Sequence, residues 1–138
     1  MTVLQTTDLA GAALDWAVAK ALGCELMSSH DHFRRVAALS WDEDKIAAHL
    51  AKQVDSQVIV NPFTGNSEPI PNYSGSWSAT GPIIERELIT LDRFGGAWLA
   101  RKWNSNHEPQ CATGETLLVA AMRCFVVARL GWTIEVPG

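Results

Sequence analysis

The sequence has few of the residues on which disulfide frameworks, zinc sites and nucleic-acid binding depend. Its three cysteines, Cys24, Cys111 and Cys124, form no CxxC pair and are odd in number, so they predict neither a disulfide framework nor a zinc knuckle. Lys and Arg number 11 against 15 Asp and Glu, which gives a formal charge of −4. Because phosphate binding rests on clustered basic residues, this balance argues against direct nucleic-acid binding. The cysteine usage favours a reducing cytoplasm.

Long apolar runs and catalytic signatures are missing as well. The longest apolar run, 117–127, is interrupted by one arginine and is shorter than the roughly 20 residues that a bilayer span requires. No GxSxG elbow, P-loop or HExxH motif occurs. A Cys111 nucleophile with His107 as base, and a metal held by His30 and His32 with a third ligand, stay open as alternatives. We expect no enzyme activity, no cofactor, no metal and no membrane span.

A chain of 138 residues with 47% hydrophobic composition is the size of one domain, and we expect a single globular unit over residues 1–138. Hydrophobic periodicity predicts helices over residues 10–22 and 41–53. Cap and stop signals predict two further helices, a short one over residues 82–87 that starts at Pro82 and one over residues 115–130 that ends before Gly131. Ser40, Thr80 and Thr113 are the expected N-caps of the last three. Strands are predicted over residues 57–60, 88–91, 97–103 and 132–136, and loops over residues 61–78 and 104–112.

Two of these segments define the architecture. The helix at 115–130 is apolar almost all round, which is typical of a central helix covered on several sides. Strands 88–91 and 97–103, joined by a turn with two glycines, predict a β-hairpin whose second strand places Trp98 and Trp103 on opposite faces. The predicted fold class is α+β: a small, mainly antiparallel sheet packed against two or three helices, including a largely buried C-terminal helix.

The run from Tyr73 to Leu91 is the most informative segment, because it joins a loop rich in aromatic and hydroxyl residues to a predicted helix start. Exposed helix-start amides and an arginine could hold an anionic ligand, and tryptophan faces could stack on a planar base. The candidate ligand-binding residues are Asp15, Trp16, Tyr73, Ser74, Trp77, Thr80, Gly81, Arg86, Trp98 and Arg123. In the alternative interpretation, the tryptophans fill the core and Arg86 pairs with Glu87 or another acid.

Three blocks of the sequence resemble the phage NinX-like family of uncharacterised proteins: residues 9–23, the run 73–91, and residues 120–131 with 135–137. The resemblance implies a bacteriophage or prophage accessory protein in the cytoplasm of the bacterial host. The chain departs from the family pattern at Ser76, where an acidic residue commonly precedes the tryptophan, and it has one glycine before Pro82 where the family has two. Residues 24–61 lie outside the resembling blocks and could be a branch-specific insertion.

These observations lead to two hypotheses about function. The first is a non-catalytic binder of a small polar, nucleotide-like molecule that could sequester a host anti-phage immune signal. The alternative is a protein–protein interaction module that acts on a host or phage protein of DNA metabolism. Self-association is left open, because a small domain with several hydrophobic helices could bury one face in a homo-oligomer.

Overall fold

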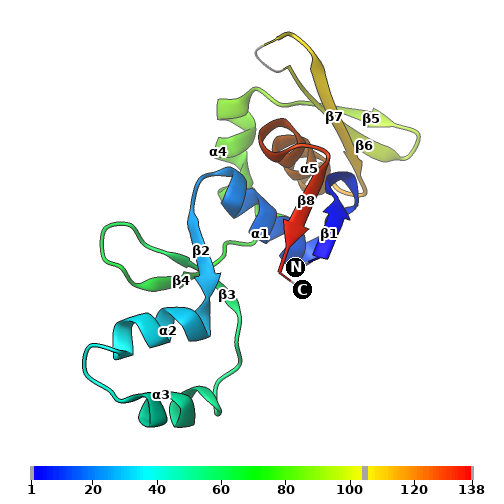
Figure 1. Cartoon of the computed structure of the whole chain (residues 1–138). Coiled ribbons are helices and arrows are strands. Elements are labelled where there is room, and N and C mark those ends of the chain that lie inside the picture. The colour runs from blue at the N-terminus through cyan, green and yellow to red at the C-terminus, as the bar shows by residue number, and fades with distance from the viewer. Residues whose placement is uncertain (1, 104–105, 138) are drawn as a thin grey trace. The chain divides into compact units, whose positions relative to one another are not determined.

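The computed structural model describes residues 2–103 and 106–137. The chain divides into two compact units (Figure 1). The first unit combines Met1–Leu22 with Pro71–Gly138, and the second unit is Gly23–Ile70. The second unit overlaps the segment 24–61 that the sequence sets apart. The single domain over residues 1–138 and the insertion at 24–61 stay predictions.

The first unit contains three α-helices, two small sheets and a short 3-10 helix among its described residues. In chain order its elements are β1 (Thr2–Gln5), η1 (Thr6–Asp8), α1 (Gly11–Ala21), α4 (Trp77–Glu87), β5 (Thr90–Phe94), β6 (Ala97–Trp103), β7 (Pro109–Gly114), α5 (Leu117–Leu130) and β8 (Thr133–Val136). Strands β5, β6 and β7 form one antiparallel sheet, while β1 pairs with β8 in a second one. The first and last described strands of the chain are therefore neighbours.

Helix α5 is the centre of the first unit. It packs against β6 and β7 and also contacts α1 and α4 (Figure 1). Phe125, Met122 and Cys124 are fully buried on it, as expected for a helix without a continuous polar face. The predicted buried C-terminal helix is confirmed, but its N-cap is Thr116, whose Oγ1 accepts a hydrogen bond from the Val119 amide at 3.2 Å, so the prediction of Thr113 as cap is wrong.

The predicted β-hairpin is also confirmed, with different bounds. Gly95 and Gly96 form a two-residue turn between β5 and β6, and both have positive φ, 58° and 87°. Two residues with positive φ are the signature of the type I′ turn, whose twist matches that of the strands. Leu88, predicted to start the first strand, instead ends α4 with a left-handed φ of 54°.

Two predictions about the middle of the first unit are wrong. Helix α4 begins at Trp77 rather than at Pro82, so Thr80 lies inside the helix and its hydroxyl donates to the Ser76 carbonyl at 2.9 Å instead of capping. Strand β7 includes residues 109–112 of the segment 104–112 that was predicted to be a polar loop, and residues 104 and 105 of that segment lie outside the described part of the chain. The first error arose because Pro82 lies inside the helix rather than in its first turn, and the second because β7 is recognisable only from its pairing with β6.

The second unit has a three-stranded antiparallel sheet and two helices. Its elements are β2 (Glu25–Ser28), α2 (Ser29–Ala37), α3 (Glu43–Leu50), β3 (Gln57–Val60) and β4 (Ser67–Pro69), with strand order β2-β3-β4. Its small core consists of Ala37, Ile46 and Leu50, against which Phe33 and Trp41 pack. β3 matches the predicted strand, whereas β2, α2 and β4 were not predicted.

The predicted helix at 41–53 is present in shortened form as α3, and its predicted cap is wrong. The side chain of Asp42, and not that of Ser40, accepts the hydrogen bond from the Lys45 amide at 2.8 Å. Every strand pairing in the described residues is antiparallel, and α5 packs on the β5–β7 sheet, so the α+β prediction is confirmed. Within the same residues, no helix is long and apolar enough to cross a membrane.

Candidate functional site

One contact in the first unit brings several predicted site residues together. The Asp15 carboxylate on α1 accepts a hydrogen bond from the Ser74 amide at 2.7 Å, which ties the loop before α4 to α1. Trp16 and Tyr73, next to these two residues in sequence, are both buried. The loop before α4 is thus anchored at residues that the sequence predicted to bind a ligand. The Asp15 carboxylate already accepts a hydrogen bond from this loop.

Trp16 carries an unusual feature at this place. Its indole Nε1 is buried and makes no hydrogen bond to any residue that the structure describes. A buried donor without a partner costs roughly 1–3 kcal/mol. Lys20, one turn further along α1, places its Nζ 5.2 Å from the centre of the ring.

The predicted residues on α4 do not share one face. Trp77 is 57% exposed, whereas Thr80 is fully buried and the Cα of Gly81 borders open space. Trp77 and Arg86 are nine residues apart, which corresponds to about 180° around the helix and about 13.5 Å along its axis. A single small ligand therefore cannot lie against both side chains on one side of α4.

The last two predicted residues have structural contacts of their own. Arg123 on α5 donates from Nε to the Leu9 carbonyl at 2.7 Å and from Nη1 to the Thr113 carbonyl at 2.8 Å. Trp98 on β6 is half-buried, and the Arg93 guanidinium lies 5.1 Å from its ring centre. The predicted residues thus occupy several places in the first unit, and their role in ligand binding stays a prediction.

The densest charge arrangement in the first unit lies around Glu87, at the end of α4. We call Arg86, Glu87, Lys102 and Arg129 the Glu87 cluster. The Glu87 carboxylate lies 2.9 Å from Arg129 Nη2, 3.3 Å from Arg86 Nε and 3.8 Å from Lys102 Nζ. Lys102 Nζ also donates to the Glu87 carbonyl at 2.9 Å. Three cations on one carboxylate leave a formal charge of +2.

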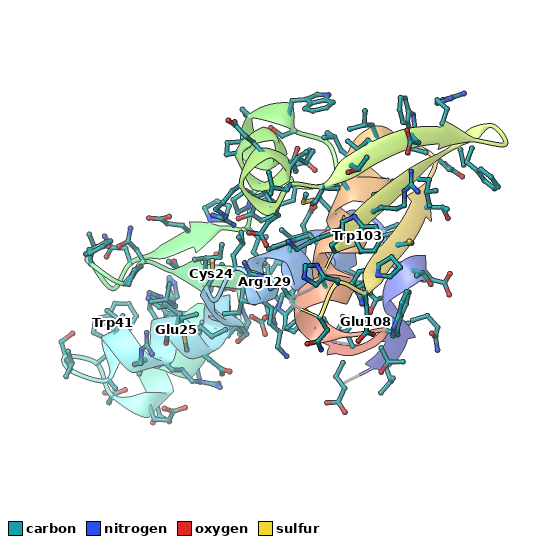
Figure 2. All side chains as sticks on the ribbon, turned by 90° about the horizontal axis from the view of Figure 1, so that it is seen from above. Cys24, Glu25, Trp41, Trp103, Glu108 and Arg129 are labelled. Atoms are coloured by element: carbon teal, nitrogen blue, oxygen red, sulfur yellow. The ribbon has the colours of Figure 1, made fainter. Side chains whose placement is uncertain are left out.

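Exposure within the Glu87 cluster is uneven. The Glu87 side chain is only 10% exposed, whereas those of Arg86 and Arg129 are 58% and 44% exposed. Burial opposes ionisation of Glu87, but hydrogen bonds from Arg129 and Arg86, with the charges of Arg129 and Lys102, outweigh it and lower its pKa. The acid is thus held as a nearly buried anion, with guanidinium groups in contact with solvent. The Arg129 side chain is labelled in Figure 2.

Sequence reasoning identified Arg86 and its possible pairing with Glu87, but not Lys102 or Arg129. The neighbouring pair Arg86 and Glu87 was visible, and the alternative in which they form an ion pair agrees with the structure. Lys102 comes from β6 and Arg129 from α5, so only the packing of three elements reveals that they meet. No local spacing in the sequence could have indicated it.

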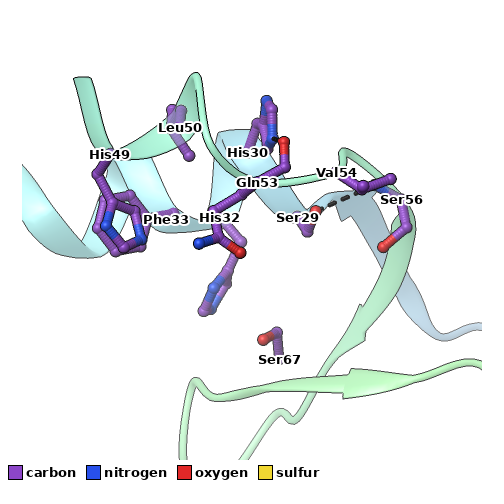
Figure 3. Close-up of a pocket in the computed structure, with 10 residues that line it drawn as sticks. All are labelled: Ser29, His30, His32, Phe33, His49, Leu50, Gln53, Val54, Ser56 and Ser67. Atoms are coloured by element: carbon purple, nitrogen blue, oxygen red, sulfur yellow. Dashed lines mark hydrogen bonds between the residues drawn. The ribbon is translucent and has the colours of Figure 1, made fainter. Parts of the chain in front are cut away.

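The second unit contains a pocket of about 330 Å³ (Figure 3). Its lining residues are Ser29, His30, His32, Phe33, His49, Leu50, Gln53, Val54, Ser56 and Ser67. His30 Nε2 lies 2.9 Å from the Gln53 carbonyl, and His32 Nε2 lies 2.8 Å from the Gly65 carbonyl. The two imidazoles are thus held by different backbone groups. No group of three or more metal-ligating side chains occurs among the described residues.

Comparison with known proteins supplies the family. The family described as "Bacteriophage P22, NinX" matches residues 5–129, which is most of the chain and includes the whole second unit. A search of curated proteins found no match. The chain therefore belongs to the bacteriophage P22 NinX family, as the resemblance of its three sequence blocks implied.

Proposed function

We propose that this bacteriophage protein is a non-catalytic binder of a small, anionic, nucleotide-like molecule. The observation that carries the proposal is the Glu87 cluster, which concentrates a formal charge of +2 in a chain with a net charge of −4. A local positive site on a negative protein attracts small anions without favouring long polyanions. This distinguishes a nucleotide-sized ligand from DNA.

The guanidinium groups of the Glu87 cluster suit phosphate. Arg86 and Arg129 each donate one N–H to Glu87. The other N–H donors of each guanidinium group can therefore bind a ligand. Planar arginine forks bind phosphate oxygens in a bidentate manner. Phe125 lies 5.2 Å from the Arg129 guanidinium and limits its freedom. The nearly buried Glu87 carboxylate positions the guanidinium groups, and its single negative charge cannot neutralise all three cations of the cluster.

The proposed biological role rests on two points. The protein belongs to a phage protein family, and the proposed binding leaves the ligand unaltered. A phage protein that holds a nucleotide-like signal in the host cytoplasm would lower its free concentration and weaken an anti-phage response. The proposal requires that the Kd of the complex be at or below the concentration of that signal during infection.

Thermal unfolding against a ligand panel tests this proposal. The panel contains pyrophosphate, cyclic mononucleotides, cyclic dinucleotides and ADP-ribose, and a ligand at 100 times its Kd adds about 2.7 kcal/mol to stability. We expect one anionic class to raise the melting temperature, and Arg86→Gln and Arg129→Gln to remove the shift. Arg101→Gln is the matched control, because this exposed arginine pairs with the single carboxylate of Asp92. A shift that both cluster variants retain would refute the site.

A second candidate function is protein binding, and a separate observation favours it. Trp77, Trp103 and Trp132 are exposed by 57%, 61% and 51%, and exposed tryptophans are typical anchors of protein interfaces. We expect Trp77→Ala to abolish co-purification of one partner from phage-infected cells. Phe63→Ala, which removes an exposed aromatic ring from the second unit, should not affect it. Equal recovery with both variants would exclude Trp77 as an anchor.

A further inference from the structure

We propose that the pocket of the second unit is a separate binding site for an uncharged, planar heteroaromatic molecule of nucleobase size. The site goes beyond the proposed function, because it shares no residue with the Glu87 cluster. Its volume of about 330 Å³ lies at the lower end of the roughly 300–1,000 Å³ range of small-molecule sites. Residues from α2, α3, the 51–56 segment and β4 line it (Figure 3).

The lining of the pocket selects against ions. None of its ten residues is Asp, Glu, Lys or Arg. Taking an ion out of water without a countercharge is costly, so a charged ligand would gain little from entering. Hydroxyl, amide and imidazole groups supply the polar contacts instead, and these suit a neutral molecule with hydrogen-bonding edges.

Two histidines of the pocket have a defined tautomer. A carbonyl oxygen can only accept a hydrogen bond, so His30 Nε2 donates to the Gln53 carbonyl and His32 Nε2 donates to the Gly65 carbonyl. In each neutral ring, Nδ1 is then the acceptor. The histidines therefore offer acceptors of fixed identity to a ligand that carries N–H groups.

The other polar side chains of the pocket have hydrogen-bonding capacity to spare. The side chains of Gln53, Ser56 and Ser67 make no hydrogen bond within the described residues, although each lines the pocket. The Gln53 amide can donate and accept at once, as can each serine hydroxyl. These groups complement the edge of a nucleobase, which alternates donors and acceptors.

Aromatic side chains also line the site. The rings of Phe33 and His49 stack with their centres 4.4 Å apart and their planes 16° from parallel, and both line the pocket beside Leu50 and Val54. Trp41 meets both rings edge-on, at 5.4 Å from Phe33 and 5.6 Å from His49, and holds the stack from outside the pocket. Aromatic groups of this kind favour a planar ring over an aliphatic ligand.

Histidine side-chain NMR on the full-length protein tests the site. The probes are the neutral compounds adenine, uracil and nicotinamide, with adenosine monophosphate and benzamidinium as charged comparators. We expect at least one neutral probe to shift the ring resonances of His32 and His49 in a saturable manner, and the charged probes to bind more weakly. The Arg86→Gln and Arg129→Gln variants should leave this binding unchanged, which separates it from the proposed anion site.

Two pocket variants and one control decide the outcome. Ser67→Tyr on the edge strand β4 places a ring in the pocket, and Gln53→Ala removes an exposed amide at little risk to folding. Each should weaken binding, Ser67→Tyr on the order of tenfold or more, an effect that corresponds to about 1.4 kcal/mol. Ser40→Tyr makes the same exchange at an exposed position outside the pocket and should have no effect. Unshifted histidines, tighter binding of the charged probes, or full binding by both pocket variants would overturn the inference.

Discussion

At the scale of single residues, Glu87 has the most demanding environment in the first unit. Its carboxylate is nearly buried, yet it has three cationic partners from α4, β6 and α5. Removing the negative charge of Glu87 would leave its three cationic partners to repel one another without compensation. Glu87 therefore joins three elements of the unit, and its ionisation matters to stability as well as to the proposed ligand site.

We predict that Glu87→Gln destabilises the protein by roughly 2 kcal/mol at neutral pH, because hydrogen bonds to charged groups are lost. The pKa of Glu87 is lowered in the folded state, so its contribution is present above the unfolded value near 4.5 and is lost as pH falls through the folded value. Urea unfolding at pH 7 and at pH 3 measures both effects. The difference between variant and wild type should shrink at the lower pH.

Glu85→Gln is the control for this prediction. Glu85 is an exposed acid on the same helix, and substitutions at such positions usually change stability by less than about 0.5 kcal/mol. A Glu87→Gln variant as stable as Glu85→Gln, or a deficit that does not shrink between pH 7 and pH 3, would contradict the role assigned to the carboxylate.

At the scale of elements, the contact of β7 with α5 depends on a glycine. A Cβ at Gly114 would lie 2.6 Å from the Ala120 backbone nitrogen and 3.0 Å from Val119 Cγ1. Backbone atoms cannot move aside as a flexible side chain can. The strand approaches the first turn of α5 this closely because residue 114 has no side chain.

We predict that Gly114→Ala destabilises the protein by roughly 1–3 kcal/mol through overpacking. Gly81→Ala is the matched comparison, because a Cβ at this helical position meets no atom within 4 Å. It should stabilise the protein by up to about 1 kcal/mol, since alanine is the better helix former. Thermal unfolding of both variants checks the prediction, and shifts of the same sign would contradict it.

The elements also show what the sequence could predict. Helices α1 and α5 and the β5–β6 hairpin have local signals, namely apolar periodicity and the glycines at 95–96, and they were recognised. Strands β4 and β7 are sheet edges that contain Pro69 and Pro109, so they look like loops until their partner strand is in place. The start of α4 was misplaced because Pro82, which favours the first turn of a helix, lies in its sixth position.

The candidate sites also divide into features with a local sequence signal and features that arise only from tertiary packing. Arg86 was predicted from its place in a short helix after an aromatic loop, but Lys102 and Arg129 join it only through tertiary packing. In the second unit, His30 and His32 were noticed as a metal pair, whereas the structure bonds each to a different carbonyl. Their i, i+2 spacing suits one side of a strand, but on helix α2 two positions with this spacing are rotated by about 200° about the helix axis.

At the scale of the whole molecule, the two units differ in how much core they possess. The second unit relies on Ala37, Ile46 and Leu50 with two flanking aromatic rings, whereas the first is built around the buried helix α5. Small units bury a smaller fraction of their surface on folding and are less stable. Unequal stability is the expected result.

We predict that denaturant unfolds the second unit before the first. Trp41 is the single tryptophan of the second unit, so its fluorescence reports on that unit. We expect the fluorescence change at the lower denaturant concentration to disappear in Trp41→Phe, while far-UV circular dichroism retains a later transition. Coincident transitions by both signals would show that the two units unfold as one cooperative structure.

The pairing of β1 with β8 has a consequence for synthesis on the ribosome. Residues 2–5 leave the ribosome before their partners at 133–136, which follow only after all the residues between the two strands. The second unit has its complete sequence once residue 70 has been translated, and it can fold while the first unit still lacks α5. During translation, α1 would therefore expose apolar residues that α5 later covers, and in this interval the nascent chain is open to chaperones and proteases.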